Sequence, residues 1–175
     1  MSGKIKCCSA TDNCCDETSF IEMQKKEGYY MSSKSEIATV YFASGFNCAQ
    51  SVLATFCEQY GLEKNIAFKM CSGLGSGFRC GDICGAVSGA ALVIGLKYGQ
   101  DEAGNKVAKG HCNNKTIEFM NLFREKNKAV TCRGILGFDL SVREEFEQAQ
   151  KKNLFKTTCV DMVKSAVALL EELGY

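Results

Sequence analysis

Along most of the chain, hydrophobic positions recur every three or four residues, which is the spacing of one face of an α-helix. Strict alternation of apolar and polar residues, the pattern typical of a β-strand, is scarce. Ser19, Ser33 and Ser141 each stand three positions before a glutamate, as in a capping box. These signals predict helices near residues 20–30 and 34–44 and another after Ser141, and thus an all-α fold.

A third helix is predicted over about residues 48–60, with Asn47 as its N-cap and Gly61 just after its end. At about 100° per residue, Cys48 and Cys57 lie on opposite edges of this helix and cannot serve one site while it is intact. The apolar face between them consists of Ala49, Val52, Leu53, Phe56 and Tyr60.

The segment from residue 83 to about 98 is apolar or small on every side, which is typical of a buried central helix. Asp82 is its predicted N-cap. Gly81, Gly85 and Gly89 recur every four residues and would let a neighbouring backbone approach closely. We therefore expect one helical domain to pack around this Gly/Ala-rich helix.

The remaining segments complete the predicted order. Residues 99–113 are interpreted as a surface loop, and Asn114 can begin a helix that ends near residue 128. Cys132 to Leu136 should form a short turn or helix after Thr131, and the last helix should cover about 154–173. The face of that last helix that we expect to point inward consists of Phe155, Cys159, Val163, Ala166, Leu170 and Leu173.

Composition limits the possible functions. A chain of 175 residues can bury a core without disulfides, and an apolar content of 46% with 23% charged residues is ordinary for a globular protein. The formal net charge of +1 gives no basic surface for nucleic acid. The longest apolar run, Ile83 to Leu96, is shorter than the roughly 20 residues that cross a bilayer. We expect neither nucleic-acid binding nor membrane insertion.

The cysteine content is the unusual feature, since the chain has 12 cysteines and only one histidine. Its first residues lack the apolar stretch of a signal peptide, so we expect a cytoplasmic protein with reduced thiols. In that compartment, clustered cysteines bind a metal or carry out redox chemistry more often than they form structural disulfides.

Three cysteines are predicted at helix starts, where backbone N–H groups favour the thiolate form that binds metals and attacks disulfides. Cys84 falls in the first turn of the central helix, and Cys48 and Cys132 begin two other helices. Cys57 and Cys71 have no such position and are interpreted as core residues.

A Cys/Ser/Asp-rich head at residues 1–16 precedes the helical domain, which we expect over 17–175. The head is predicted to be flexible, and its spacing matches neither a zinc motif nor a ferredoxin motif. A second cluster, a soft-metal site, a redox tail and a plain disordered segment all stay open for it. Its thiols are Cys7, Cys8, Cys14 and Cys15.

Two other patterns resemble functional motifs but are interpreted as structural. His111 and Cys112 are neighbours in sequence, whereas catalytic Cys-His partners usually meet across the fold. The glycines at residues 73–77 follow a helical pattern and lack the Lys-Ser/Thr ending of a phosphate-binding loop. Cys80 lies in the loop after them, as either an idle thiol or a resolving partner for Cys84.

Four cysteine segments occur in order: Gly45-Phe-Asn-Cys48-Ala-Gln-Ser-Val52, Cys84-Gly-Ala-x-x-Gly89-Ala90, Cys132-Arg-Gly-Ile-Leu136, and Cys159 in the last helix. From about Ala43 to Leu173 the chain thus resembles the C_GCAxxG_C_C family of redox-active proteins, which is named for its cysteine pattern. The resemblance implies that these are the family's four defining cysteines and that the function is redox. Similar domains occur joined to cytochrome-like modules, which implies electron transfer with a redox partner protein.

Three hypotheses remain for this site. Four thiolates suit an iron-sulfur cluster or tetrahedral zinc equally well by ligand softness, and the family resemblance favours iron-sulfur bound by Cys48, Cys84, Cys132 and Cys159. Cys80, four positions before Cys84, is an alternative to Cys159 in this ligand set. The second hypothesis is a thiol-disulfide oxidoreductase in which Cys84 attacks and Cys80 or Cys48 resolves. The third is a zinc-stabilised interaction module without catalysis. The sequence predicts neither the oligomeric state nor the identity of the redox partner.

Overall fold

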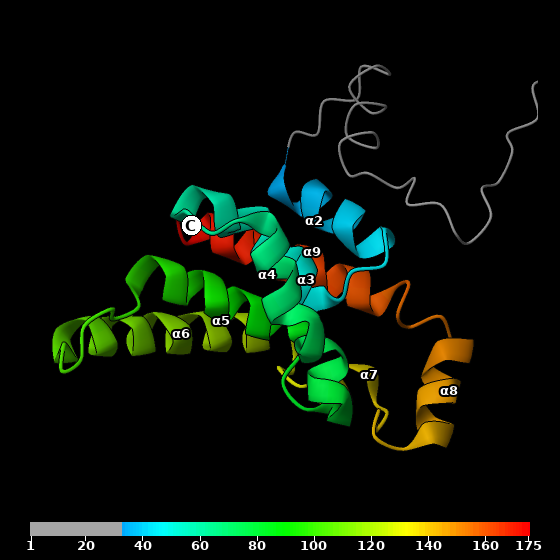
Figure 1. Cartoon of the computed structure of the whole chain (residues 1–175). Helices are drawn as coiled ribbons and strands as arrows, with labels where there is room; N and C mark the ends of the chain where they lie inside the picture. The colour runs from blue at the N-terminus through cyan, green and yellow to red at the C-terminus, as the bar shows by residue number, and fades with distance from the viewer. Residues whose placement is uncertain (1–32) are drawn as a thin grey trace, which may run out of the picture. The chain divides into compact units, whose positions relative to one another are not determined.

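The computed structural model describes residues 33–175, and this part of the chain is helical and contains no strand (Figure 1). The prediction of an all-α fold is confirmed. Residues Ser33–Tyr175 form one compact unit. The helices are α2 (Lys34–Ala43), α3 (Cys48–Phe56), α4 (Lys64–Cys71), α5 (Gly85–Tyr98), α6 (Lys106–Asn127), α7 (Cys132–Leu136), α8 (Arg143–Lys151) and α9 (Thr158–Glu172).

Several predictions concern residues outside the described part of the chain. They are the helix near residues 20–30 with its capping box at Ser19, the head at residues 1–16, and the boundary at residue 17. The capping box at Ser33 lies inside the described part and is present, since the Ser33 side chain accepts from the N–H of Glu36 and the Glu36 side chain accepts from the N–H of Ser33.

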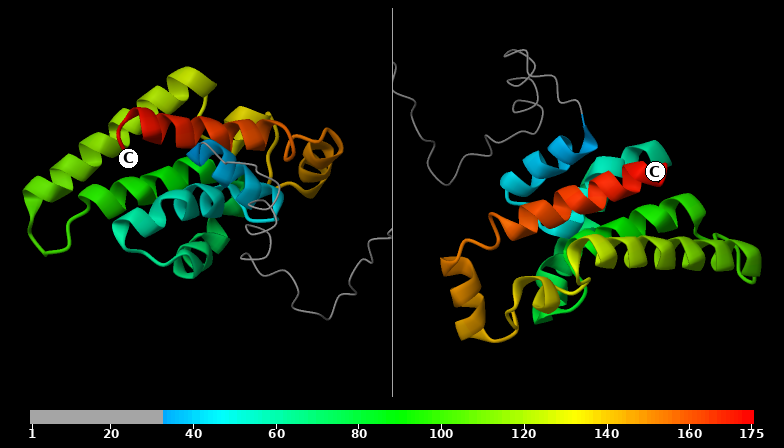
Figure 2. Two further views of the ribbon diagram at one scale, coloured as in Figure 1. Left: turned by 90° about the horizontal axis from the view of Figure 1, so that it is seen from above. Right: turned by 180° about the vertical axis from the view of Figure 1, so that it is seen from behind.

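The core is built around α5, which contacts α3, α6 and α9. Helices α5 and α6 are joined by the short loop after Tyr98 and spread apart from it (Figure 2, left). Gly89 allows α3 to approach closely, because a Cβ atom there would lie 2.8 Å from the backbone oxygen of Ala49. Gly85 does the same one turn earlier, since its Cβ would lie 3.1 Å from the Cβ of Cys48. The predicted buried central helix with close glycine packing is thus confirmed.

The start of α3 follows the sequence prediction. The Asn47 side chain accepts hydrogen bonds from the N–H groups of Ala49 and Gln50, each at 3.0 Å. The Gln50 side chain accepts from the N–H of Asn47 at 2.8 Å and completes a capping box. The helix continues as a 3-10 turn, Cys57–Tyr60, and ends at Gly61 with a φ of 77°. Cys48 is therefore fixed at the first position of a well-capped helix.

The predicted start of α5 was wrong. The helix begins at Gly85 with Cys84 as its N-cap, whereas the sequence predicted a start at residue 83 with Asp82 as the cap. Asp82 to Cys84 is extended because its backbone pairs with a distant segment, through hydrogen bonds from Cys84 N–H to the Val130 carbonyl and from Cys132 N–H to the Asp82 carbonyl, each 2.8 Å. A contact between distant segments overrode the local capping signal.

Three other predicted boundaries need correction. Residues 106–113 are not surface loop, because α6 begins at Lys106 and Asn105 caps it by accepting from the N–H of Ala108. Ser141 does not form a capping box, because its hydroxyl donates to Asp139 at 2.6 Å and Val142 is the N-cap of α8. The last helix begins at Thr158, four residues after its predicted start.

None of the helices in residues 33–175 combines the length and apolar character needed to cross a membrane.

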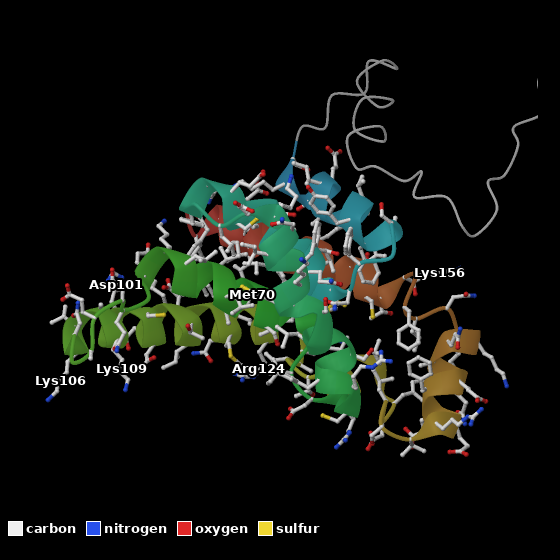
Figure 3. All side chains as sticks on the ribbon, viewed as in Figure 1. Met70, Asp101, Lys106, Lys109, Arg124 and Lys156 are labelled. Carbon is white, nitrogen blue, oxygen red and sulfur yellow. The ribbon has the colours of Figure 1, made fainter. Side chains whose placement is uncertain are left out.

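Charged side chains cover the outer end of the α5–α6 pair, where Asp101, Lys106 and Lys109 lie at the opposite end of these helices from α7 and α8 (Figure 3). The candidate site lies near the start of α5, away from this charged end.

Candidate functional site of four cysteines

Four cysteines from four different helices come together near the start of α5. Cys48 is the first residue of α3, Cys84 is the N-cap of α5, Cys132 is the first residue of α7, and Cys159 is in the first turn of α9. Their thiols form two hydrogen-bonded pairs, Cys48 with Cys159 and Cys84 with Cys132. The thiol of Cys48 also lies within electrostatic range of the other three.

Backbone pairing positions Cys84 beside Cys132. An isolated antiparallel bridge joins Ile83 to Thr131, and the two 2.8 Å hydrogen bonds described above flank it. Thr131 then caps α7, since its hydroxyl oxygen accepts from the N–H of Gly134 at 3.1 Å. Each of the two cysteines therefore stands where a short extended segment meets the start of a helix, and the two segments are held together by the bridge.

Close packing positions Cys48. The missing side chain of Gly85 lets the first turn of α3 lie against the start of α5, where a Cβ would be 3.1 Å from the Cβ of Cys48 and 3.2 Å from the N of Ala49. Such contacts are tighter than a side chain tolerates without movement of a neighbour. Gly85 therefore keeps the Cys48 side of the site next to Cys84.

The environment of Cys84 favours its thiolate. The S–H of Cys132 donates to Cys84 and lowers its pKa, and the N–H groups of Ala86 and Val87 lower the pKa further. Burial opposes them, because a thiolate loses hydration in the core. The net pKa of Cys84 is below its usual value although the residue is only 4% exposed.

Cys48 and Cys132 show the opposite behaviour. The hydrogen bond to Cys159 raises the pKa of Cys48, and burial and the charges of the neighbouring thiols raise it further. The hydrogen bond to Cys84 is the largest cause that raises the pKa of Cys132, followed by burial. Thiolates packed together repel one another, so a full set of thiolates requires a compensating positive charge such as a metal centre provides.

A cleft of about 200 Å³ reaches three of these thiols. Cys48, Cys132 and Cys159 line it, whereas Cys84 is not among its lining residues. The other walls are mostly apolar, so the cleft lets a small molecule or a partner surface approach the thiols without exposing them widely to water. These walls consist of Phe42, Phe46, Asn47, Ser76, Leu136, Leu140 and Phe155.

The donor set can be compared with the groups that four thiols bind. Within residues 33–175, no three His, Cys, Asp or Glu side chains already form a site for a single metal ion. By ligand softness, four thiolates suit structural zinc and an iron-sulfur cluster alike. Four soft thiols with backbone N–H groups beside two of the sulfurs, Cys84 and Cys132, fit the chemistry of an iron-sulfur cluster.

The other described cysteines lie elsewhere. Cys80 is exposed, its S–H donates to the Gly77 carbonyl at 3.1 Å, and it lines a separate cleft with Arg133. Cys57 and Cys71 are fully buried, and Cys112 is half-buried against the core. The ring of His111 stacks on Tyr98 with centroids 4.6 Å apart. The thiols of Cys7, Cys8, Cys14 and Cys15 lie outside the described residues.

Sequence reasoning missed the pairing of Cys84 with Cys132. The local signal for it is the β-branched residues beside each thiol, Ile83 before Cys84 and Val130-Thr131 before Cys132, which favour extended backbone. Such short runs do not identify the segment they pair with, so the pairing becomes visible only in three dimensions.

A family model described as "Putative redox-active protein (C_GCAxxG_C_C)" matches residues 46–173. The matched region begins just before Cys48 and ends beyond Cys159, so it contains all four cysteines of the site. No curated protein and no solved structure gives a match.

Proposed function

Because the chain belongs to the C_GCAxxG_C_C family of redox-active proteins, we propose that its four clustered cysteines hold an iron-sulfur cluster that exchanges electrons with a partner protein. The observation that carries this proposal is the convergence of four thiols from four separate helices. The ligands would be Cys48, Cys84, Cys132 and Cys159.

The cluster would supply a one-electron couple, and the chain's own residues would set its surroundings. The N–H groups of Ala86 and Val87 point at the sulfur of Cys84, and that of Gly85 points at Cys132. Hydrogen bonds to cluster sulfurs and low solvent exposure are the levers by which proteins adjust the potential. A partner protein would approach the cluster through the apolar cleft at Cys159. A reducing compartment suits free thiols, so the predicted cytoplasmic location stays part of this proposal.

Protein purified without oxygen tests the proposal. We expect a brown protein whose iron and acid-labile sulfide contents are similar. Cys84→Ser should lose most of the iron, because a hydroxyl is a far poorer ligand for a soft centre than a thiolate. Cys71→Ser is the matched control, since Cys71 is equally buried but lies outside the site, and it should keep its iron.

A colourless protein that carries zinc alone, even after reconstitution with iron and sulfide, would overturn the cluster. The third hypothesis, a zinc-stabilised interaction module, would then lead. Equal loss of iron in the Cys84 and Cys71 variants would show that the loss comes from unfolding rather than from a missing ligand, and a circular dichroism spectrum of each variant separates these cases.

A second candidate function is thiol-disulfide exchange, which the hydrogen bond between Cys84 and Cys132 favours. The Cys84 thiolate would attack a disulfide of a partner protein, forming a mixed disulfide and releasing one partner thiolate. Cys132, after losing its proton, would attack the Cys84 sulfur, so the Cys84–Cys132 disulfide forms and the partner leaves with both its sulfurs reduced. The sequence predicted Cys80 or Cys48 as the resolving residue, and the hydrogen bond to Cys84 makes Cys132 a further candidate. Metal-free protein that reduces an added disulfide, and loses this activity in Cys132→Ser, would support it.

A further inference from the structure

A second cleft adjoins the cysteine cleft and carries positive charge. It measures about 240 Å³, and its walls include Arg79, Arg143 and Phe146. Ser76 and Leu140 line both clefts, so the two share part of their walls. Their combined volume lies within the range of small-ligand pockets, about 300–1,000 Å³. The combined space is apolar beside the thiols and cationic at its other end.

A strained turn places Arg79 at this cleft. Ser76, Gly77, Phe78 and Arg79 follow one another with φ values of 56°, 61°, 56° and 64°. Three of them carry side chains, for which a left-handed backbone is unfavourable because the Cβ crowds the following carbonyl oxygen. Only glycine fits the second position, because a Cβ on Gly77 would lie 2.5 Å from the backbone N of Asp82. Backbone strain of this kind clusters at ligand-binding sites.

The two arginines keep donors free for an anion. Arg79 forms no ion pair with any residue in 33–175. Arg143 pairs only with Glu147 on its own helix, at 3.2 Å, and its side chain is 87% exposed. Such exposed i,i+4 pairs are weak and screened by water, so an anion can compete for the Arg143 guanidinium. Glu145, in the first turn of α8, is engaged away from the arginines, because its carboxylate accepts a hydrogen bond from the backbone N–H of Asp139.

We propose that the joined clefts bind a small aromatic anion. Its carboxylate, phosphate or sulfonate is held by Arg79 and Arg143, and its ring system lies on the apolar wall beside Cys132 and Cys159. Guanidinium groups bind such oxyanions with charge-assisted hydrogen bonds. Binding itself is independent of the proposed cluster, and only a role as electron donor or acceptor would rest on the proposed function.

The test uses a fluorescent pair of probes on the full chain. Anilinonaphthalene sulfonate is an aromatic anion, and N-phenyl-1-naphthylamine is the same ring system without the sulfonate. We expect the sulfonate probe to bind more tightly to the wild-type protein. Arg79→Gln and Arg143→Gln should each weaken it about three- to tenfold and leave the neutral probe unchanged. Arg124→Gln is the matched control, since Arg124 lies exposed on α6 and contacts Asn121 (Figure 3).

Phe155→Leu, which trims the apolar wall, should weaken both probes. Three results would each overturn the proposal: no saturable binding of the sulfonate probe, unchanged affinity in both cleft variants, or an equal loss in Arg124→Gln. The iron content of the same samples reports on the cluster separately, because none of these substitutions removes a cysteine. Loss of the cluster with intact probe binding, or the reverse, therefore identifies which proposal has failed.

Discussion

Cys71 and Cys84 are both buried in the same core, yet their thiols differ in acidity. Burial, followed by the charge of Cys57, raises the pKa of Cys71 to about 11. The pKa of Cys84 is lowered despite its own burial, because Cys132 and two backbone N–H groups donate to its sulfur. Burial alone therefore makes a cysteine inert, and donors directed at the sulfur make it reactive.

The positions of the two cysteines along their helices add to the contrast in acidity. Cys71 is the last residue of α4, where the carbonyl end of the helix disfavours a negative charge. Cys57 occupies the C-cap of α3, and its S–H donates to the Ala54 carbonyl at 3.5 Å. Cys84 stands at the opposite, amino end of a helix, where N–H groups favour a thiolate. A cysteine's place along its helix thus separates packing residues from chemical ones.

The largest expected effect is on thiol reactivity in reduced, metal-free protein. A pKa of about 11 at Cys71, against a usual value of 9.0, leaves about 100-fold less thiolate at neutral pH than an ordinary thiol has. We expect Cys84 to react with limiting iodoacetamide at least about 100-fold faster than Cys71, as mapped by peptide mass. Cys80→Ser protein avoids competition from that exposed thiol. Preferential labelling of Cys57 or Cys71 would refute the comparison.

Glycine substitutions should distinguish the close contact between α3 and α5 from the open surface of α6 by their effect on the free energy of unfolding. Gly89→Ala should destabilise the protein by about 1–3 kcal/mol, because its Cβ would lie 2.8 Å from the Ala49 oxygen and 3.0 Å from the Val52 Cβ. Gly110→Ala in α6 is the control, with nothing within 4 Å of its Cβ, and should stabilise by up to about 1 kcal/mol. Urea unfolding measures both. Gly85→Ala presses on Cys48, so it should also lower the iron content.

The local rules of sequence predicted part of this site. Asn47 and Thr131 are recognisable caps, so Cys48 and Cys132 were correctly expected at helix starts. The sequence did not reveal that Cys84 occupies the N-cap of α5, because Asp82 is the better cap by residue type. Asp82 is extended because its backbone pairs with the segment at Thr131. The early start of α6 was hidden by Gly110, a poor helix former that the helix nonetheless includes. Neither the pairing of Asp82 with the segment at Thr131 nor the inclusion of Gly110 in α6 leaves a clear local pattern in the sequence.

A pH titration of stability should sharpen the comparison further. The folded pKa of Cys71, about 11, is above its unfolded value near 9.0. Its protonated thiol therefore stabilises the fold fully below pH 9, and this contribution, up to about 2 kcal/mol, is lost as the pH rises from 9 to 11. Cys71→Ala should remove that part of the decline in urea unfolding of metal-free protein. A decline identical to that of the wild type would contradict the pKa assignment.

Cys84 should give the opposite slope. Its folded pKa is lowered, so its thiolate stabilises the metal-free fold above the unfolded pKa, and the contribution is lost as the pH falls through the folded pKa. Cys84→Ala should therefore lack a gain in stability that the wild type shows as the pH approaches 9. The same unfolding titration measures both variants, and slopes of the same sign in the two would refute the contrast.

The smallest effect is expected at the amino terminus. Deleting residues 1–16 should leave the helix content and the iron content unchanged, because the family match begins at residue 46 and the four site cysteines all follow it. Circular dichroism and iron analysis check this. An empty truncated protein beside a metal-loaded Cys84→Ser variant would place the chemistry in the head.

The bridge between Ile83 and Thr131 also has a consequence for the order of folding. It joins segments on either side of the α5–α6 pair, so Cys84 and Cys132 can meet only after that pair has closed. Cys48 gains its partner only when α9 has docked, because Cys159 lies on that helix. Contacts between such distant segments form late, since they must first overcome the entropy of closing the chain between them. A partly folded chain therefore offers scattered thiols, and the complete set of four exists only once the tertiary structure has formed.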